Sequence, residues 1–164
     1  AMSVVERSLD PIGLPMGPFE LIDLVGWKVA AHVQDTMVAA FPDRFYASPN
    51  LHAAAELEHP LAKNKAGKVE DLSREAKKAL SFGKSPVGGE EILRRVEDEL
   101  AGEIRIMLDE GVVAAAEDID LCLILGAGWP FQAGGATPYL DRVGASERVF
   151  GEKFHNPPVA GEHS

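Results

Sequence analysis

Apolar residues recur at intervals of three and four along much of the chain, which is the spacing of one face of an α-helix. One such series consists of Ile22, Val25, Val29, Val33, Met37 and Phe41. The series predicts a short helix over 18–25, a break at Gly26, and a longer helix that ends near Phe41, because Pro42 cannot continue a helix. Stretches that alternate apolar and polar residues are scarce, so the pattern predicts an all-α fold.

A second apolar series lies in the other half of the chain and consists of Leu93, Val96, Leu100, Ile104, Met107 and Leu108. It predicts an amphipathic helix over 90–110 that stops at Gly111, since glycine is favoured just after a helix C-terminus. Further helices are predicted over 117–125, 138–143 and 146–154, with turns at the Gly and Pro residues between them.

Two Gly-x-Pro turns, each followed by a similar helix, form an internal repeat. Gly13-Leu-Pro15, the first corner, recurs 115 positions later as Gly128-Trp-Pro130, the second corner. Leu21-Ile-Asp-Leu-Val-Gly26 then recurs as Tyr139-Leu-Asp-Arg-Val-Gly144. Under this offset the helix over 90–110 has no partner in front of the first corner. The fold is therefore expected to contain two related helical units, the first of them truncated at its N-terminus.

The repeat divides the chain into four predicted segments. They are a first, truncated unit over 3–60, a basic linker over 61–87, a second unit over 88–155 and a flexible tail over 156–164. The stretch 61–84 carries seven Lys or Arg residues, whereas the whole chain has a net charge of −10. We interpret this stretch as a solvated connector, with an anion-binding patch as the alternative. The acidic remainder argues against a nucleic-acid partner.

Residue patterns that carry chemistry are sparse. The apolar runs fall well short of the roughly 20 residues that span a bilayer, so no membrane span is predicted. Cys122 has apolar neighbours and is expected to be a buried, inert thiol. The histidines lack metal-ligand spacing, and His155, next to the predicted tail, is assigned no role. Gly126-Ala-Gly128 begins like a dinucleotide-binding fingerprint but lacks its third glycine and a preceding strand. The residues thus predict no catalytic, cofactor-binding or metal site.

The segment from Gly13 to Gly26 resembles the signature of the C-terminal domain of 3-hydroxyacyl-CoA dehydrogenases, and the resemblance continues through 43–46 and 48–51. The second corner, with Glu110-Gly111 before it, looks like the family's second copy. Two tandem copies are what the multifunctional fatty-acid oxidation proteins carry, behind an enoyl-CoA hydratase domain and a nucleotide-binding dehydrogenase domain. The resemblance covers about residues 4–155.

This resemblance implies a cytoplasmic parent enzyme of fatty-acid β-oxidation. Such an α subunit hydrates 2-enoyl-CoA, oxidises 3-hydroxyacyl-CoA with NAD, and pairs with a thiolase β subunit. The family's catalytic His and Glu resemble residues of the nucleotide-binding domain, so no catalytic residue carries over onto this chain. The resemblance therefore implies an oxidoreductase as the parent, and a fragment that neither binds NAD nor turns over substrate by itself.

In the family, the first corner lines the cleft that faces the nucleotide-binding domain. The resemblance implies that Pro15, Met16, Pro18 and Phe19 form an apolar wall for the acyl–pantetheine arm of acyl-CoA. A rigid corner that only packs core is the alternative reading of these residues. A non-enzymatic helical interaction or dimerisation module is the alternative function, and a regulatory protein that binds acidic partners through 61–84 is a third. The missing helix predicts exposed apolar surface that a homodimer of the fragment would bury.

Overall fold

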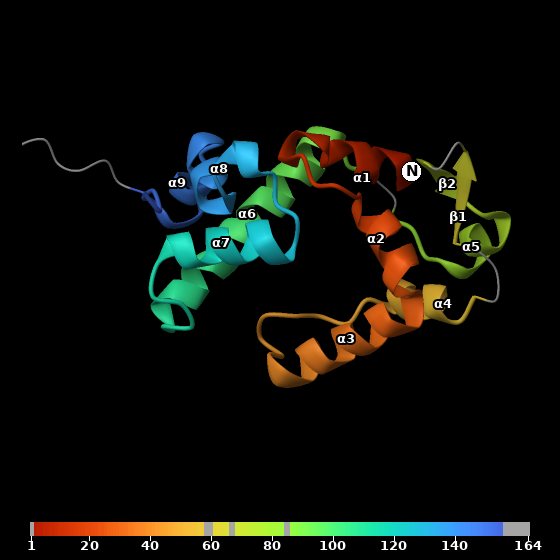
Figure 1. Cartoon of the computed structure of the whole chain (residues 1–164). Coiled ribbons are helices and arrows are strands. Elements are labelled where there is room, and N and C mark those ends of the chain that lie inside the picture. The colour runs from red at the N-terminus through yellow and green to blue at the C-terminus, as the bar shows by residue number, and fades with distance from the viewer. Residues whose placement is uncertain (1, 58–60, 66–67, 84–85, 156–164) are drawn as a thin grey trace, which may run out of the picture. The chain divides into compact units, whose positions relative to one another are not determined.

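The computed structural model describes residues 2–57, 61–65, 68–83 and 86–155, and the all-α prediction is confirmed apart from one small hairpin. The elements of the first half are α1 (Met2–Ser8), a 3-10 turn (Asp10–Ile12), α2 (Pro18–Val25), α3 (Trp27–Ala40), α4 (Pro49–Ala55), β1 (Ala62–Lys65), β2 (Lys68–Leu72) and α5 (Arg74–Ala79). Those of the second half are α6 (Gly89–Asp109), α7 (Ala116–Gly126), a 3-10 turn (Phe131–Ala133), α8 (Ala136–Arg142) and α9 (Ala145–Phe150). Figure 1 shows this order from red to blue.

The predicted helices lie close to their expected positions. α2 has the expected bounds, α3 ends one residue before Phe41, and α6 differs from the predicted 90–110 by one residue at each end. α9 ends at Phe150 rather than near residue 154, because Gly151 adopts a left-handed φ of 86° there. The predicted tail over 156–164 lies outside the described residues.

The chain forms two compact units. Unit 1 contains the residues up to Ser8 together with Met16–Gly88, and unit 2 contains Leu9–Pro15 together with the chain from Gly89 onward. The first corner is therefore part of unit 2, although the helices on either side of it belong to unit 1. The division into repeats at 3–60, 61–87 and 88–155 stays a prediction.

Unit 1 has a small core in which the hairpin takes part. β1 and β2 pair antiparallel, with Ala62 opposite Leu72 and Lys65 opposite Lys68, and β2 packs against α1. Buried residues of the core include Met2, Ala54, Leu61, Leu72 and Ala76. A two-stranded hairpin is marginal by itself, and the buried leucines at its ends supply the support it needs. The stretch interpreted as a solvated connector is thus partly folded into unit 1.

Unit 2 has the larger core. α6 packs against α9, and α7, α8 and the first corner complete the cluster (Figure 1). Its buried members are Ile12, Ala101, Ile104, Ile119, Trp129, Ala136, Tyr139, Leu140 and Ala145. Residues far apart in sequence thus share one interior. This interior, rather than the short helices themselves, stabilises the second corner.

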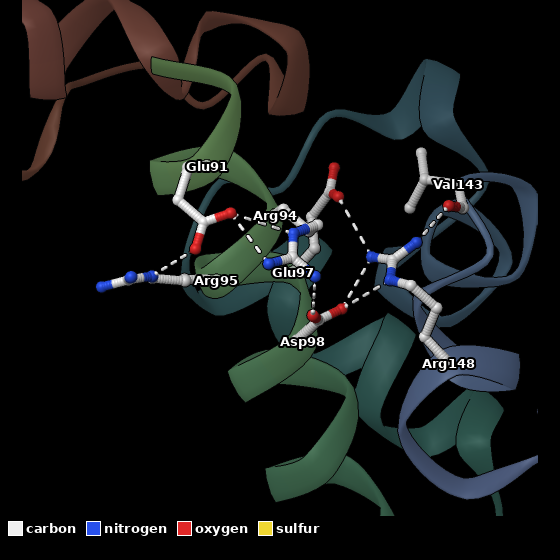
Figure 2. A network of polar contacts seen from close by, with 7 residues as sticks. All are labelled: Glu91, Arg94, Arg95, Glu97, Asp98, Val143 and Arg148. Carbon is white, nitrogen blue, oxygen red and sulfur yellow. Dashed lines mark hydrogen bonds and ion pairs between the residues drawn. The ribbon is translucent and has the colours of Figure 1, made fainter. Parts of the chain in front are cut away.

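Ion pairs join α6 to α9 at the edge of this core. Figure 2 shows the guanidinium of Arg148 beside two acidic residues of α6. Its Nη2 lies 2.6 Å from Asp98 and 3.7 Å from Glu97, and its Nη1 donates to the Val143 carbonyl oxygen at 2.9 Å. Arg148 therefore holds the acidic face of α6 against α9.

The expected burial of Cys122 is wrong, because this thiol is exposed on α7. α7 is apolar on more than one face, and the core of unit 2 covers the face that carries Ile119. The neighbouring Leu121 and Leu125 are 58% and 77% exposed. Apolar neighbours in the sequence therefore did not indicate which side of the helix is buried.

Candidate functional site

The two corners pack against each other with matching geometry inside unit 2. Gly13 and Gly128 have left-handed φ angles of 79° and 71°. A Cβ at Gly13 would lie 3.1 Å from the Pro130 ring, and a Cβ at Gly128 would lie 3.3 Å from the Pro15 ring. Each glycine thus makes room for the proline of the other corner. This reciprocal contact agrees with the internal repeat.

A carboxylate caps the helix that follows each corner. In unit 1, Oε1 of Glu6 accepts hydrogen bonds from the backbone N–H groups of Phe19 and Glu20, at 2.8 and 3.1 Å. In unit 2, Asp120 accepts from the backbone N–H of Thr137 at 2.8 Å and from its hydroxyl at 2.6 Å. A carboxylate suits a helix N-terminus, where N–H groups are unpaired and the dipole is positive.

Each capping carboxylate lies against a glycine just before the capped helix. Gly17 faces the carboxylate of Glu6, and a Cβ at Gly135 would lie 2.5 Å from Cγ of Asp120. Gly135 follows Gly17 by 118 positions, as Tyr139 follows Leu21. The sequence analysis did not predict either cap. Glu6 and Asp120 are 114 positions apart, so the offset of 115 between the corners does not align them, and their side chains differ in length. A glycine before each helix was the available signal.

The residues predicted to form the acyl-CoA wall lie in different surroundings. Pro15 contacts Gly128 in unit 2, whereas Met16, Pro18 and Phe19 belong to unit 1. Met16 is 37% exposed and Pro18 is the first residue of α2. Phe19 is half-buried and stacks on Trp27, with ring centroids 6.3 Å apart. Their role as a wall stays a prediction.

Phe19 lines an apolar cavity of about 460 Å³ inside unit 1. α1, α2, α3, α4 and β2 all contribute to its lining, as do Leu80 and Phe82 beyond α5. Its apolar side chains include Val5, Phe19, Ile22, Trp27, Ala54 and Leu72. Met16 and Pro18 are not among the described residues that line it. The volume and lining are typical of a site for an apolar ligand.

His155 takes part in a buried polar cluster of unit 2, although the sequence assigned it no role. Its Nε2 lies 2.7 Å from the hydroxyl of Thr137, which in turn donates to Asp120. The carboxylate of Asp141 accepts from the backbone N–H groups of Phe154 and His155. Thr137 is fully buried and Asp120 is 7% exposed. These groups satisfy one another, so the cluster is structural in character.

Tyr139 supplies a second buried polar contact, with α6. It is 8% exposed, and its hydroxyl donates to Oε1 of Glu97 at 2.6 Å. Burial, and then the hydrogen bond to this carboxylate, raise the pKa of Tyr139 well above the ordinary tyrosine value of 10.0. The folded state therefore favours the neutral phenol.

The raised pKa of Tyr139 predicts a loss of stability in alkali. The contribution is fully present below about pH 10 and is lost as the pH rises from there toward the folded-state pKa. Tyr139→Phe should remove this part of the pH dependence of the free energy of unfolding. The chain has two tyrosines, and Tyr46 is 84% exposed. Absorbance titration of a Tyr46→Phe variant isolates Tyr139, and ionisation of Tyr139 before the chain unfolds would contradict the expectation.

The segment 126–133 does not form the turn of a dinucleotide-binding fingerprint. Gly126 ends α7, Gly128 forms the second corner, and a 3-10 turn follows at Phe131–Ala133, so the strand–turn–helix that cradles a pyrophosphate is not formed there. Within the described ranges, no group of three or more His, Cys, Asp or Glu side chains is arranged to hold a metal ion. The helices in those ranges also include none long and apolar enough to cross a bilayer.

Known proteins resemble this chain over most of its length. Residues 2–71 match the family model for the 3-hydroxyacyl-CoA dehydrogenase C-terminal domain. The fatty acid oxidation complex subunit alpha of Pseudomonas entomophila (strain L48) is 31% identical over 161 residues, which cover 88% of this chain and 22% of that protein. The subunit of the same name from Acinetobacter baumannii (strain SDF) is 29% identical over 164 residues, covering 88% and 23%.

The chain thus spans somewhat less than a quarter of the length of these relatives. The family model covers the first corner and its carboxylate cap, and the similarity to the two α subunits extends over most of the chain. The family resemblance expected from the sequence is confirmed, because residues 2–71 match the model of the 3-hydroxyacyl-CoA dehydrogenase C-terminal domain.

Proposed function

We propose that this chain is the C-terminal helical part of a multifunctional enzyme that hydrates 2-enoyl-CoA and oxidises 3-hydroxyacyl-CoA with NAD. The observation that carries the proposal is the family match over the first corner, together with a second corner of matching geometry. The parent would act in the cytoplasm, with nucleotide-binding and enoyl-CoA hydratase domains upstream and a thiolase β subunit as partner. Within it, the chain supplies helix packing, subunit contacts and part of the acyl-CoA cleft.

The proposed role is non-catalytic. The buried carboxylates of Asp120 and Glu97 accept hydrogen bonds from Thr137 and Tyr139, respectively. We therefore assign both carboxylates a role in stabilising the fold. Pro15, Met16, Pro18 and Phe19 are apolar, and they suit a wall for the acyl–pantetheine arm rather than proton transfer. NAD and the reacting carbon would be held by the other domains of the parent.

An assay of the purified chain tests the proposal. We expect no NAD-dependent oxidation of 3-hydroxybutyryl-CoA or 3-hydroxydecanoyl-CoA, and no NAD binding by calorimetry. The same chain joined to its native upstream domains should be active, whereas the upstream domains expressed alone should be unstable or inactive. Activity of the isolated chain, or full activity of the upstream domains alone, would refute it.

The exposed apolar face of α2 and α3 favours an interaction role as the second candidate. Leu21 and Leu24 are 49% and 71% exposed, and Val29 and Val33 on α3 are about half exposed. By the repeat, Leu21 corresponds to Tyr139, which α6 covers in unit 2. We propose that a helix equivalent to α6 covers this face, from a longer parent or from a second copy of the chain.

Light scattering separates the two sources of the covering helix. If a second copy supplies it, the isolated chain should be a dimer at micromolar concentration, and Leu24→Glu should return it to a monomer. Leu125→Glu, on the exposed face of α7, is the matched control and should leave the mass unchanged. A monomer that becomes fully active only when joined to its upstream domains would assign the covering helix to the parent.

A further inference from the structure

Of the four residues of the proposed acyl-CoA wall, Phe19 alone lines the apolar cavity of unit 1. Under the repeat, Phe19 corresponds to Thr137 of unit 2. In unit 2 the imidazole of His155 occupies the space next to Thr137, and its Nε2 forms a hydrogen bond with the Thr137 hydroxyl at 2.7 Å. In unit 1 the equivalent position faces a cavity instead. The cavity is therefore a property of unit 1 and not of the repeated corner.

The cavity also lies on a different side of α2 from the exposed face that carries Leu21 and Leu24. Phe19 and Ile22 both line it, and residues three apart share one face of a helix. Leu21, which corresponds to the α6-facing Tyr139, points away from that face. A helix that covers Leu21 would therefore leave the cavity open.

The lining determines what the cavity can hold. Among the described residues around it none is charged, and its polar members are Ser48 and Asn50. The amide of Asn50 is already engaged, because it donates to the Ser81 carbonyl at 2.7 Å and accepts from the Ser81 N–H at 2.8 Å. The interior thus offers apolar contact and little hydrogen bonding. A charged or strongly polar group would lose its hydration there without compensation.

We propose that this cavity binds a hydrocarbon chain whose polar end stays at the mouth. A smaller apolar cavity of about 150 Å³ already takes up apolar molecules from water, and this one measures about 460 Å³. Four helices and one strand contribute to its wall, and the flexible side chain of Met2 is part of the lining. A flexible chain follows such an irregular wall better than a rigid planar ring does. The proposal concerns unit 1 alone and does not depend on the dehydrogenase activity of a parent.

The test uses straight-chain alcohols from hexanol to decanol, which carry no charge and no CoA. Binding to the chain is measured by calorimetry and by the emission of Trp27, which lines the cavity, in a Trp129→Phe background. Affinity should rise about fourfold with each added methylene group, because each one leaves water for the apolar interior. Absence of alcohol binding would refute the cavity proposal and leave the family relation intact. Refutation of the proposed enzyme function would leave the cavity proposal intact.

Two substitutions fill the cavity and one serves as control. Ala54→Phe and Ile22→Phe both add volume to its lining and should weaken decanol binding at least tenfold while affecting hexanol less. Leu125→Phe, which adds the same side chain on the exposed face of α7, should leave both affinities unchanged. Circular dichroism confirms that each variant is folded. Uptake that does not saturate, or equal weakening by all three variants, would overturn the proposal.

Discussion

Replacement of Gly135 by alanine should destabilise unit 2 by about 3–5 kcal/mol. Gly135 has a φ of 122°, a conformation that L-residues rarely adopt, and its new Cβ would lie 2.5 Å from Cγ of Asp120. The buried carboxylate would have to move, and both of its hydrogen bonds to Thr137 would be lost. Backbone strain and the loss of a buried cap therefore add together.

Gly134→Ala is the matched control for this prediction. Gly134 is also left-handed, with a φ of 78°, but the nearest atom to its Cβ would be Pro138 Cβ at 4.0 Å. Its substitution should cost only the left-handed strain, about 1–2 kcal/mol. Urea unfolding followed by Trp129 emission, in a Trp27→Phe background, measures both. Equal losses at the two glycines would show that the contact with Asp120 does not matter.

Leu140→Ala should destabilise unit 2 by about 2–5 kcal/mol. Leu140, on α8, is completely buried, at 0% exposure, in the core of unit 2. Removal of its side-chain carbons loses their transfer free energy and leaves a void that close-packed neighbours cannot fill. The same urea experiment with Trp129 emission gives the change in the free energy of unfolding.

The repeat supplies the comparison for Leu140. Ile22 occupies the equivalent position in unit 1, but it is half-buried and already faces a cavity. Ile22→Ala should therefore cost less, about 1–2 kcal/mol, as measured by Trp27 emission in a Trp129→Phe background. A loss at Ile22 as large as that at Leu140 would mean that unit 1 is packed as tightly as unit 2.

The longer helices could be predicted because their apolar spacing persists over several turns. α3 and α6 each carry such a series, and Gly and Pro mark their ends. α4 and α5 have seven and six residues, which is too short for a period of 3.6 to be recognised. The hairpin escaped prediction because its strands of four and five residues are rich in lysine and lack alternation.

The candidate site was harder to predict than the fold. The corners have a local signature of Gly and Pro, and a signature of that kind can be read from a single segment. The cavity has no such signature, because its lining comes from residues spread between Met2 and Phe82. The carboxylate caps likewise join Glu6 to Phe19 and Asp120 to Thr137 across a turn. Such pairs depend on how the helices meet, which spacing along one helix does not reveal.

The assignment of Leu9–Pro15 to unit 2 has a consequence for how the chain can be divided. The backbone passes from one unit to the other after Ser8, again after Pro15 and a third time after Gly88. A single cut after Gly88 would deprive the downstream piece of Ile12, which is only 2% exposed in its core. No single break in the backbone therefore releases either unit intact. A fragment of unit 2 produced by gene fission or limited proteolysis after Gly88 would have to retain the seven residues Leu9–Pro15 as a bound peptide.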